Sequence, residues 1–355
     1  MASSGEQTFN LFITSPLEPG FVEQIRAVDP KRVAVVYEPD LYPPTQYVAD
    51  HHGPTGFTHT DEQEALVRQR LGEADFLFDF PHPMPQGGSI LELAPRLKWV
   101  QTTSAGVGQQ VVRMGLQDTD LIVTTASGVH ARPLAEFVFL ALLSHVKELP
   151  RLQRDQRERR WQRFCSDDLD GKTLAIVGPG RIGSQVAQIG RCFNMRVTAM
   201  GRRGGAERAA ELGVDTVYTR EQLHQMLGEA DAVLLSCPHT PETENLMDRE
   251  AIKAIKPGAM FVNISRGSVV DEAALLDALR DGRIAFAGLD VFRQEPLPAD
   301  SPFWDLPNVL INPHSASTAY SENQKITDIL CDNLRCYLDG RLGEMRNVLD
   351  KRRMY

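Results

Sequence analysis

The stretch that decides the fold begins Lys172-Thr-Leu-Ala-Ile-Val-Gly178-Pro179-Gly180-Arg181-Ile182-Gly183 and ends Arg196-Val-Thr-Ala-Met-Gly201-Arg202-Arg203. An apolar strand from Thr173 to Val177 leads into three glycines with the spacing G-x-G-x-x-G. A segment with apolar residues at helical spacing follows, and a second strand closes the unit at Val197 to Met200. This strand, turn, helix and strand predict a parallel βαβ unit.

The three glycines predict a dinucleotide-binding turn. Gly178 suits the tight turn, Gly180 the close approach of a pyrophosphate, and Gly183 the close packing of the helix on the strand. The free amides near Arg181 and Ile182, at the start of the helix, suit an anion. A glycine-rich turn without a ligand is the simpler alternative, but the strand and helix on either side favour the dinucleotide site.

The composition describes a globular protein of ordinary type. Of the 355 residues, 42% are hydrophobic and 24% are charged, which is enough apolar material for two cores. The formal net charge of −9 argues against a general surface for nucleic acid or anionic membranes. We find no secretory signal and no apolar run of membrane-spanning length. The five scattered cysteines predict reduced, mostly buried thiols, so we expect a cytoplasmic protein.

Alternating strand and helix patterns extend on both sides of the opening stretch. They predict an α/β fold of two doubly wound parallel-sheet domains with a cleft between them. We expect a flavodoxin-like substrate domain of residues 1–130 and 319–355, and a Rossmann dinucleotide-binding domain of residues 131–318. The last helix, Glu322 to Leu338, should cross back and pack on the first domain.

Two segments depart from the alternation. Residues 39–59 are rich in Pro, Tyr, His and Gly, and His51, His52 and His59 lie there. A surface loop is the expectation, because no Cys or carboxylate spacing supports a metal site. An apolar helix from Leu134 to Leu149 runs into a charged arm. Trp161 and Phe164 at the end of that arm suggest an oligomer contact, and we expect a homodimer through residues 136–164.

A small-residue loop follows the predicted strand that ends near Thr102. The amides of Ala105, Gly106 and Val107 suit a small carboxylate, since ligands of open α/β sheets bind beyond the carboxyl ends of the strands. From spacing alone, a plain strand-to-helix turn is an equally good interpretation.

Three polar residues follow predicted strands of the second domain, and these are Arg266, Glu295 and His314. An Arg grips a carboxylate and a carbonyl oxygen with its planar fork. A His gives or takes a proton near neutral pH, and a Glu beside it stabilises the protonated ring and orients it. Three unrelated surface residues are the alternative, which their shared position at strand ends makes less attractive.

Several runs, in this order and spacing, resemble the D-isomer-specific 2-hydroxyacid dehydrogenase family over nearly the whole chain. The runs are Ser104-Ala105-Gly106, Ser127-Gly128-Val129-His130, Leu235-Ser-Cys-Pro238-His-Thr-Pro-Glu-Thr243, Asn263-Ile-Ser-Arg266-Gly267, Gly288-Leu-Asp290-Val-Phe-Arg-Gln-Glu295-Pro296 and Asn312-Pro313-His314. The family commonly has Asp where this chain has Gly108, which puts the local turn in doubt but not the chemistry.

The resemblance implies a role for each matching residue. Arg266 would bind and polarise the substrate, His314 would be the acid/base, and Glu295 would be its carboxylate partner. The loop Ala105 to Val107 would bind the substrate carboxylate with Arg266 and His314. Asp290 would meet the nicotinamide carboxamide. The resemblance also places Pro238 and Thr243 near the cofactor, and we expect Cys237 and Ser265 there too. The opening stretch itself offers further cofactor contacts, namely Gly178, Gly180, Arg181, Ile182, Gly183, Gly201, Arg202 and Arg203.

The end of the second strand of the βαβ unit bears on the choice of cofactor. An acidic residue that binds the ribose of NAD is expected about 20 residues past the glycines. Gly201 stands there, followed by Arg202 and Arg203. This favours a 2′-phosphate and hence NADP (NADPH), with NAD the less favoured cofactor.

The leading interpretation is an NADPH-dependent reductase of a small 2-keto acid, with glyoxylate and hydroxypyruvate as candidate substrates. We expect no nucleic-acid partner, no membrane partner and no metal. Two alternatives stay open. One is an enzyme like formate dehydrogenase of the same fold, which would have Gln in place of Glu295. The other is a dinucleotide-sensing, corepressor-like binding protein.

Overall fold

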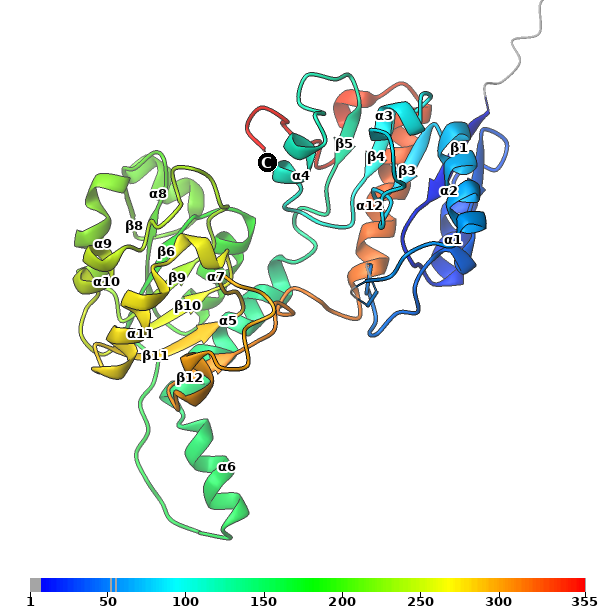
Figure 1. The fold of residues 1–355 in the computed structure, drawn as a ribbon. Helices are drawn as coiled ribbons and strands as arrows, with labels where there is room; N and C mark the ends of the chain where they lie inside the picture. The colour runs from blue at the N-terminus through cyan, green and yellow to red at the C-terminus, as the bar shows by residue number, and fades with distance from the viewer. Residues whose placement is uncertain (1–7, 52, 55, 355) are drawn as a thin grey trace, which may run out of the picture. The chain divides into compact units, whose positions relative to one another are not determined.

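The computed structural model describes residues 8–51, 53–54 and 56–354. The chain forms two compact units, one of the residues up to His130 together with those from Thr318 onward, and one of Ala131–Ser317. Each unit contains a single sheet with helices on both faces (Figure 1). The predicted class, α/β with two doubly wound parallel sheets, is confirmed.

The first sheet has the strand order β2-β1-β3-β4-β5, and every neighbouring pair is parallel. This is the flavodoxin-like order. The strands are β1 Phe9–Ile13, β2 Val33–Val36, β3 Phe76–Phe78, β4 Trp99–Gln101 and β5 Ile122–Thr124. The helices are α1 Pro19–Arg26, α2 Asp61–Glu73, α3 Ile90–Leu93, α4 Gly108–Arg113 and α12 Glu322–Leu338, with 3₁₀ turns η1 Pro39–Leu41 and η5 Leu342–Glu344.

The second sheet has the order β12-β11-β10-β9-β6-β7-β8, again parallel throughout, which is the Rossmann order with one strand added. The strands are β6 Thr173–Val177, β7 Arg196–Met200, β8 Thr216–Tyr218, β9 Ala232–Leu235, β10 Ala259–Asn263, β11 Ile284–Leu289 and β12 Val309–Ile311. The helices are α5 Ala131–Val146, α6 Leu149–Arg157, α7 Arg181–Cys192, α8 Ala206–Leu212, α9 Leu223–Glu229, α10 Arg249–Ala254 and α11 Glu272–Arg280, with 3₁₀ turns η2 Arg220–Gln222, η3 Gly267–Val269 and η4 Pro302–Asp305.

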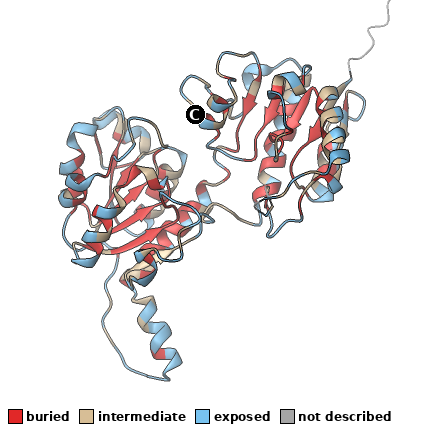
Figure 2. Ribbon diagram, viewed as in Figure 1, coloured by how far each residue is buried: buried red, intermediate tan, exposed pale blue. Residues whose placement is uncertain are grey.

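Side chains that alternate along each strand fill the cores on the two faces of each sheet. In β6, Leu174 and Ile176 join one buried cluster, while Ala175 and Val177 join the other. The strands are therefore buried on both sides (Figure 2) and run as continuous apolar segments rather than alternating ones. Among the described residues, no helix is both long enough and apolar enough to cross a bilayer.

Side-chain caps define the starts of two helices of the second unit. The Asp248 carboxylate accepts from the amide of Ala251 at 2.8 Å and caps α10. Asp271 accepts from the amide of Ala274 at 3.0 Å and caps α11. Each satisfies an amide that the first helical turn leaves unpaired.

The predicted helix from Leu134 to Leu149 needs correction, because two helices occupy this region and its arm. α5 ends at Val146 and α6 begins at Leu149, with Glu148 between them in the left-handed region at φ 52°. A residue in the left-handed region ends a helix because its backbone angles differ from those of the right-handed helix. Figure 1 shows α6 and the loop after it extending away from the sheet of the second unit.

The described residues of the 39–59 segment are irregular apart from η1, and about half of them are exposed, as expected for a surface loop. Leu41 and Asp50 anchor the segment to the first unit by being buried. His52 lies outside the described residues. The expectation for the cysteines needs correction. Of the cysteines, Cys165 and Cys192 are exposed, so the thiols are not mostly buried.

A buried cluster ties the 39–59 segment to the start of α12. Nε2 of His130 lies 3.1 Å from Oε1 of Glu322, and Nε2 of His51 lies 3.6 Å from the same oxygen. The second distance is too long for a hydrogen bond, and the contact is an ion pair only when His51 is protonated. Nδ1 of His51 is bonded to the hydroxyl of Ser15 at 3.0 Å. Burial alone would raise the pKa of Glu322, but the two histidines outweigh it and lower that pKa to about 2.

Glu322→Gln should therefore lower the free energy of unfolding at pH 7, by about 2 kcal/mol. The folded-state pKa lies below the unfolded value, so the carboxylate stabilises the protein above that value. This contribution is lost as the pH falls from about 4.5 towards 2. Urea unfolding of both proteins at pH 7 and pH 3 measures the effect. Glu23→Gln, at an exposed ion pair, is the control. Equal differences at the two pH values would contradict the assignment.

Candidate active site

The turn between β6 and α7 has the geometry that its glycines predict. Gly178 has φ 94°, and a Cβ there would lie 2.6 Å from Cα of Cys237 on the loop after β9. A Cβ on Gly183 would lie 2.8 Å from the carbonyl oxygen of Gly178 and 2.9 Å from Ile176. A Cβ on Gly180 would meet no atom within 4 Å. The turn thus combines close helix–strand packing with an open, exposed backbone position, and it fits the pyrophosphate of a dinucleotide.

The loops after β7 and β9 lie next to this turn, because β7 and β9 flank β6 in the sheet. Arg202 and Arg203 are exposed directly after β7. After β9, the Thr243 hydroxyl donates to the carbonyl oxygen of Pro238 at 2.7 Å, so these two predicted cofactor residues belong to one closed loop. Burial raises the pKa of the Cys237 thiol to about 11, which leaves this cysteine protonated at neutral pH.

The loop after β10 carries Ser265 and Arg266. Asn263 fixes this loop, since its Oδ1 accepts from the amide and the hydroxyl of Ser265 at 3.0 and 2.7 Å. The exposed Arg266 donates from Nη1 to the carbonyl oxygen of Ser265 at 2.7 Å. A Cβ on Gly267 would lie 2.0 Å from the carbonyl carbon of Phe292, so this loop is pressed against the loop after β11.

Glu295 and His314 form a direct pair. Nδ1 of His314 lies 2.7 Å from Oε2 of Glu295, and the other carboxylate oxygen accepts from the amide of Phe292 at 2.9 Å. The His314 amide donates to the carbonyl oxygen of Asp290 at 2.9 Å. His314 has φ 52°, so its backbone is held in a conformation that few side chains adopt without support.

The strand order β12-β11-β10 explains how these residues come together. The strands are parallel, so the loops that carry His314, Glu295 and Arg266 leave the same edge of the sheet side by side. The structure gives a contact between Glu295 and His314, whereas the Arg266 guanidinium bonds to its own loop.

Sequence reasoning missed the residues that orient this edge. Asn312 donates from Nδ2 to Oδ1 of Asp290 at 2.5 Å, and the amide of Ala316 donates to the same oxygen at 3.1 Å. Glu272, at the start of α11, accepts from the amide of Arg293 at 2.6 Å, and burial raises its pKa. The sequence contained two signals for these residues, an Asn at the end of a strand and a Glu in the first turn of a helix.

The candidate carboxylate loop lies in the first unit, after β4. Ser104, Ala105 and Gly106 are exposed, while Val107 is buried. The hydroxyl of Thr102 donates to the carbonyl oxygen of Ser104 at 2.8 Å, and the amide of Ala126 donates to the same oxygen at 3.1 Å. The loop is therefore anchored at its start and exposed in its middle.

Comparisons with known proteins give the chain its family. Residues 139–316 match the model of the D-isomer specific 2-hydroxyacid dehydrogenase, NAD binding domain. A glyoxylate reductase of Korarchaeum cryptofilum is 34% identical over 283 residues, which are 78% of this chain and 83% of that protein. The chain belongs to the D-isomer-specific 2-hydroxyacid dehydrogenase family. It is accordingly an NAD(P)-dependent oxidoreductase that acts on the CH–OH group of 2-hydroxy acids, as the resemblance implied.

Other members of this dehydrogenase family match as well. A D-3-phosphoglycerate dehydrogenase of Mycobacterium bovis is 38% identical over 71% of this chain, but this chain covers only 47% of that longer protein. A solved family member from Aeromonas salmonicida is 31% identical, with a TM-score of 0.77 over 97% of this chain and all of that one. Another, from Xanthobacter autotrophicus in complex with NADPH and MES, is 28% identical, with a TM-score of 0.74 over 98% of this chain and all of that one.

Proposed function

We propose that this dehydrogenase uses NADPH to reduce a small 2-keto acid to the D-2-hydroxy acid. The observation that carries the proposal is the 2.7 Å pair of His314 and Glu295, on the loops after β12 and β11, at the same edge of the sheet as the Arg266 loop after β10. Glyoxylate and hydroxypyruvate are the first substrates to test, since the 34% identical relative is named a glyoxylate reductase.

Two features support NADPH as the cofactor. The chain has Gly201, Arg202 and Arg203 where an NAD-binding protein would have an acidic residue. The Xanthobacter relative was crystallised in complex with NADPH. We assign the remaining cofactor contacts to the residues predicted from the sequence, with Asp290 at the nicotinamide.

Each catalytic residue has a distinct task in this proposal. When bound, NADPH supplies a hydride to the keto carbon. Arg266 holds the substrate carboxylate and stabilises the negative charge that grows on the keto oxygen, but it stays charged and gives no proton. His314 gives the proton, and we assign the transfer to Nε2 because Nδ1 faces Glu295. Glu295 holds the ring and stabilises the imidazolium. On the loop after β4, we assign the amides of Ala105, Gly106 and Val107 to a carboxylate of the substrate.

A screen of small 2-keto acids with NADPH and NADH tests the proposal. Consumption of NADPH with glyoxylate or hydroxypyruvate, and formation of the D-hydroxy acid, are the expected results. Tight binding of NADPH without turnover of any keto acid would instead favour a dinucleotide sensor.

We also propose that residues 1–130 and 319–355 form the substrate domain and that residues 131–318 form the dinucleotide domain. We further propose that the enzyme works in the cytoplasm.

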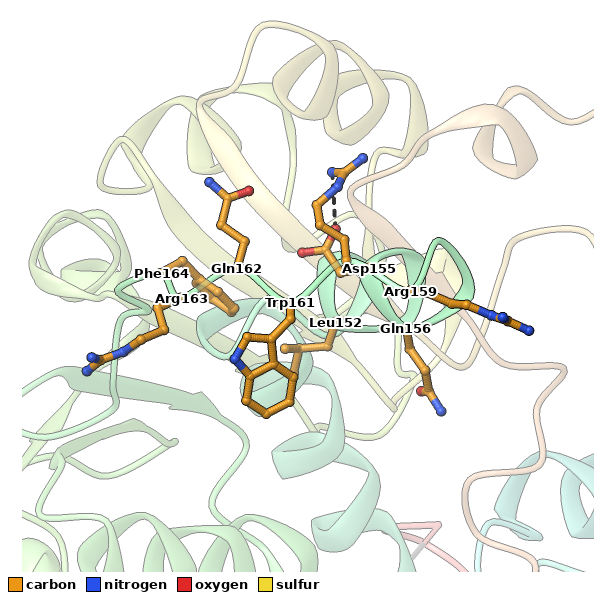
Figure 3. A pocket seen from close by; sticks show the side chains of 9 residues that line it. Leu152, Asp155, Gln156, Arg159, Trp161, Gln162, Arg163 and Phe164 are labelled. Carbon is orange, nitrogen blue, oxygen red and sulfur yellow. Dashed lines mark hydrogen bonds and ion pairs between the residues drawn. The ribbon is translucent and has the colours of Figure 1, made fainter.

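We propose that the arm formed by α6 and residues 158–164 contacts a second copy of the chain in a homodimer. Figure 3 shows the side chains of this arm. Trp161 is 98% exposed and Leu152 is 45% exposed. Burying large apolar side chains such as these is favourable, so their exposure indicates a contact surface. The guanidinium of Arg151 lies 4.0 Å from the ring centre of Phe164, and Asp155 pairs with Arg160 at 3.3 Å. These contacts give the arm a defined shape. A pocket of ≈ 470 Å³ on the arm is lined by residues between Leu152 and Phe164, none of which is a catalytic or cofactor candidate.

Sedimentation at micromolar concentration should give the mass of two chains. Leu152→Ala with Trp161→Ala should shift the protein to the mass of one chain, because buried Trp residues dominate interface energies. Leu342→Ala removes a comparably exposed side chain of the first unit and should leave the dimer intact. A wild-type monomer would rule out the dimer, and a dimer that survives the double substitution would rule out this interface.

A further inference from the structure

The segment Asn347–Met354, called the tail here, runs along the outer edge of the first sheet. The amide of Thr125 donates to the carbonyl oxygen of Asn347 at 3.0 Å, and the amide of Leu349 donates to that of Val123 at 2.8 Å. Thr124 and Val348 form an antiparallel bridge. Leu349 is buried in the core beside β4 and β5. The tail is therefore paired with the edge strand β5 rather than lying free.

The end of the tail folds into a hydrogen-bonded turn. Oδ1 of Asp350 accepts from the amides of Arg352 and Arg353, both at 3.1 Å. The Met354 amide donates to the carbonyl oxygen of Asp350 at 2.7 Å. Nζ of Lys351 donates to the carbonyl oxygens of Thr119 and Leu121, and burial lowers its pKa. These bonds hold the turn in one place on the first unit.

The turn occupies the space where residue 108 would carry a side chain. A Cβ on Gly108 would lie 2.2 Å from the carbonyl oxygen of Met354 and 2.5 Å from its Cβ. Figure 1 shows the end of the chain beside α4, the helix that Gly108 begins. Nε2 of Gln109 also faces Sδ of Met354 at 4.0 Å. This explains why the chain has Gly where its family commonly has Asp, because any side chain at position 108 would collide with the tail.

Gly108 directly follows the loop to which we assign the substrate carboxylate. Thr102 and Ala126 anchor the start of that loop through the Ser104 carbonyl. At its other end Val107 is buried, and the tail packs on the next residue. We propose that the turn Asp350–Met354 is a positioning element for the substrate, which fixes the loop Ser104–Val107 by filling the space beside Gly108. This proposal rests on the proposed function of that loop.

A double-mutant cycle tests this coupling. One variant is Gly108→Ala, one is a chain that ends at Lys351, and one combines both changes. Gly108→Ala in the full chain should raise KM for the keto acid roughly tenfold, since displacing a positioning group by ~1 Å costs up to ~100-fold. The kcat and the Kd for NADPH should stay near those of the wild type. In the shortened chain the same substitution should have no further effect, because the colliding atoms are gone.

Two controls separate positioning from general damage. Gly20→Ala introduces the same methyl group into a helix of the first unit where no atom lies within 4 Å, and it should leave KM unchanged. The shortening by itself should raise KM, because it removes the turn, and Asp350→Ala, which loosens the turn in the full-length chain, should raise KM as well. If the shortened chain does not fold, the Asp350→Ala variant replaces it in the experiment. A merely structural role of the tail would lower stability without raising KM at constant kcat.

The outcomes distinguish this proposal from the function on which it rests. If the wild type turns over no 2-keto acid with either cofactor, the proposed function fails and this proposal falls with it. If the wild type is active but Gly108→Ala leaves KM unchanged, or raises it equally in the full and shortened chains, the tail does not position the loop. A KM effect that disappears in the shortened chain supports the proposal.

Discussion

Replacing His314 with alanine should lower kcat for keto-acid reduction on the order of 10²- to 10⁴-fold, as for other general acids. The variant loses the imidazole whose Nδ1 lies 2.7 Å from Glu295, while the loops that we assign to the cofactor stay unchanged. The Kd for NADPH should therefore remain near that of the wild type. Steady-state kinetics and a fluorescence titration of NADPH measure the two quantities.

Two companion variants sharpen this experiment. Glu295→Gln keeps the size of the side chain but removes the charge that stabilises the imidazolium, so it should lower kcat by less than His314→Ala does. His224→Ala, at an exposed histidine of α9, should leave kcat unchanged. A His314→Ala enzyme with near-normal turnover would mean that another group gives the proton.

Gly201→Asp combined with Arg202→Ala should abolish or reverse the preference for NADPH, with a loss of up to about a thousandfold in affinity. A carboxylate ~4 Å from the 2′-phosphate repels it by roughly 4 kcal/mol at an effective dielectric near 20, before screening by salt. The structure accommodates the new side chain, since a Cβ at position 201 would lie 3.6 Å from Cγ of Pro179, which is an ordinary contact.

Gly201→Asn with Arg202→Ala is the matched control, because it adds nearly the same volume without the charge. This variant should lose the attraction between Arg202 and the 2′-phosphate, but it should not gain the repulsion that a carboxylate at position 201 would cause. The measurement is the ratio of kcat/KM for NADPH to kcat/KM for NADH, at low and at high salt. Equal wild-type values for the two cofactors would count against the assignment of Gly201, Arg202 and Arg203.

Much of the second sheet follows from local pattern. The strand, glycine turn and helix from Thr173 onward were predictable because a βαβ unit contains its own periodicity and turn residues. The predicted α12, Glu322 to Leu338, matches the structure because one face of the helix is apolar. The carboxyl ends of parallel strands lie at the same edge of a sheet. Recognising the three strands in the sequence was therefore enough to predict that the loops of Arg266, Glu295 and His314 lie side by side.

Other features depend on contacts between distant parts of the chain. Glu148 ends α5 in a left-handed conformation that neither Gly nor Asn marks in the sequence. His51 meets Glu322 because the 39–59 segment folds back on the start of α12, and His130, just before α5, meets the same carboxylate. Gly108 is confined by Met354, which lies about two thirds of the chain further on. Such pairs leave no periodic signal in a single sequence, since which distant groups meet is decided by how the assembled sheets and helices pack.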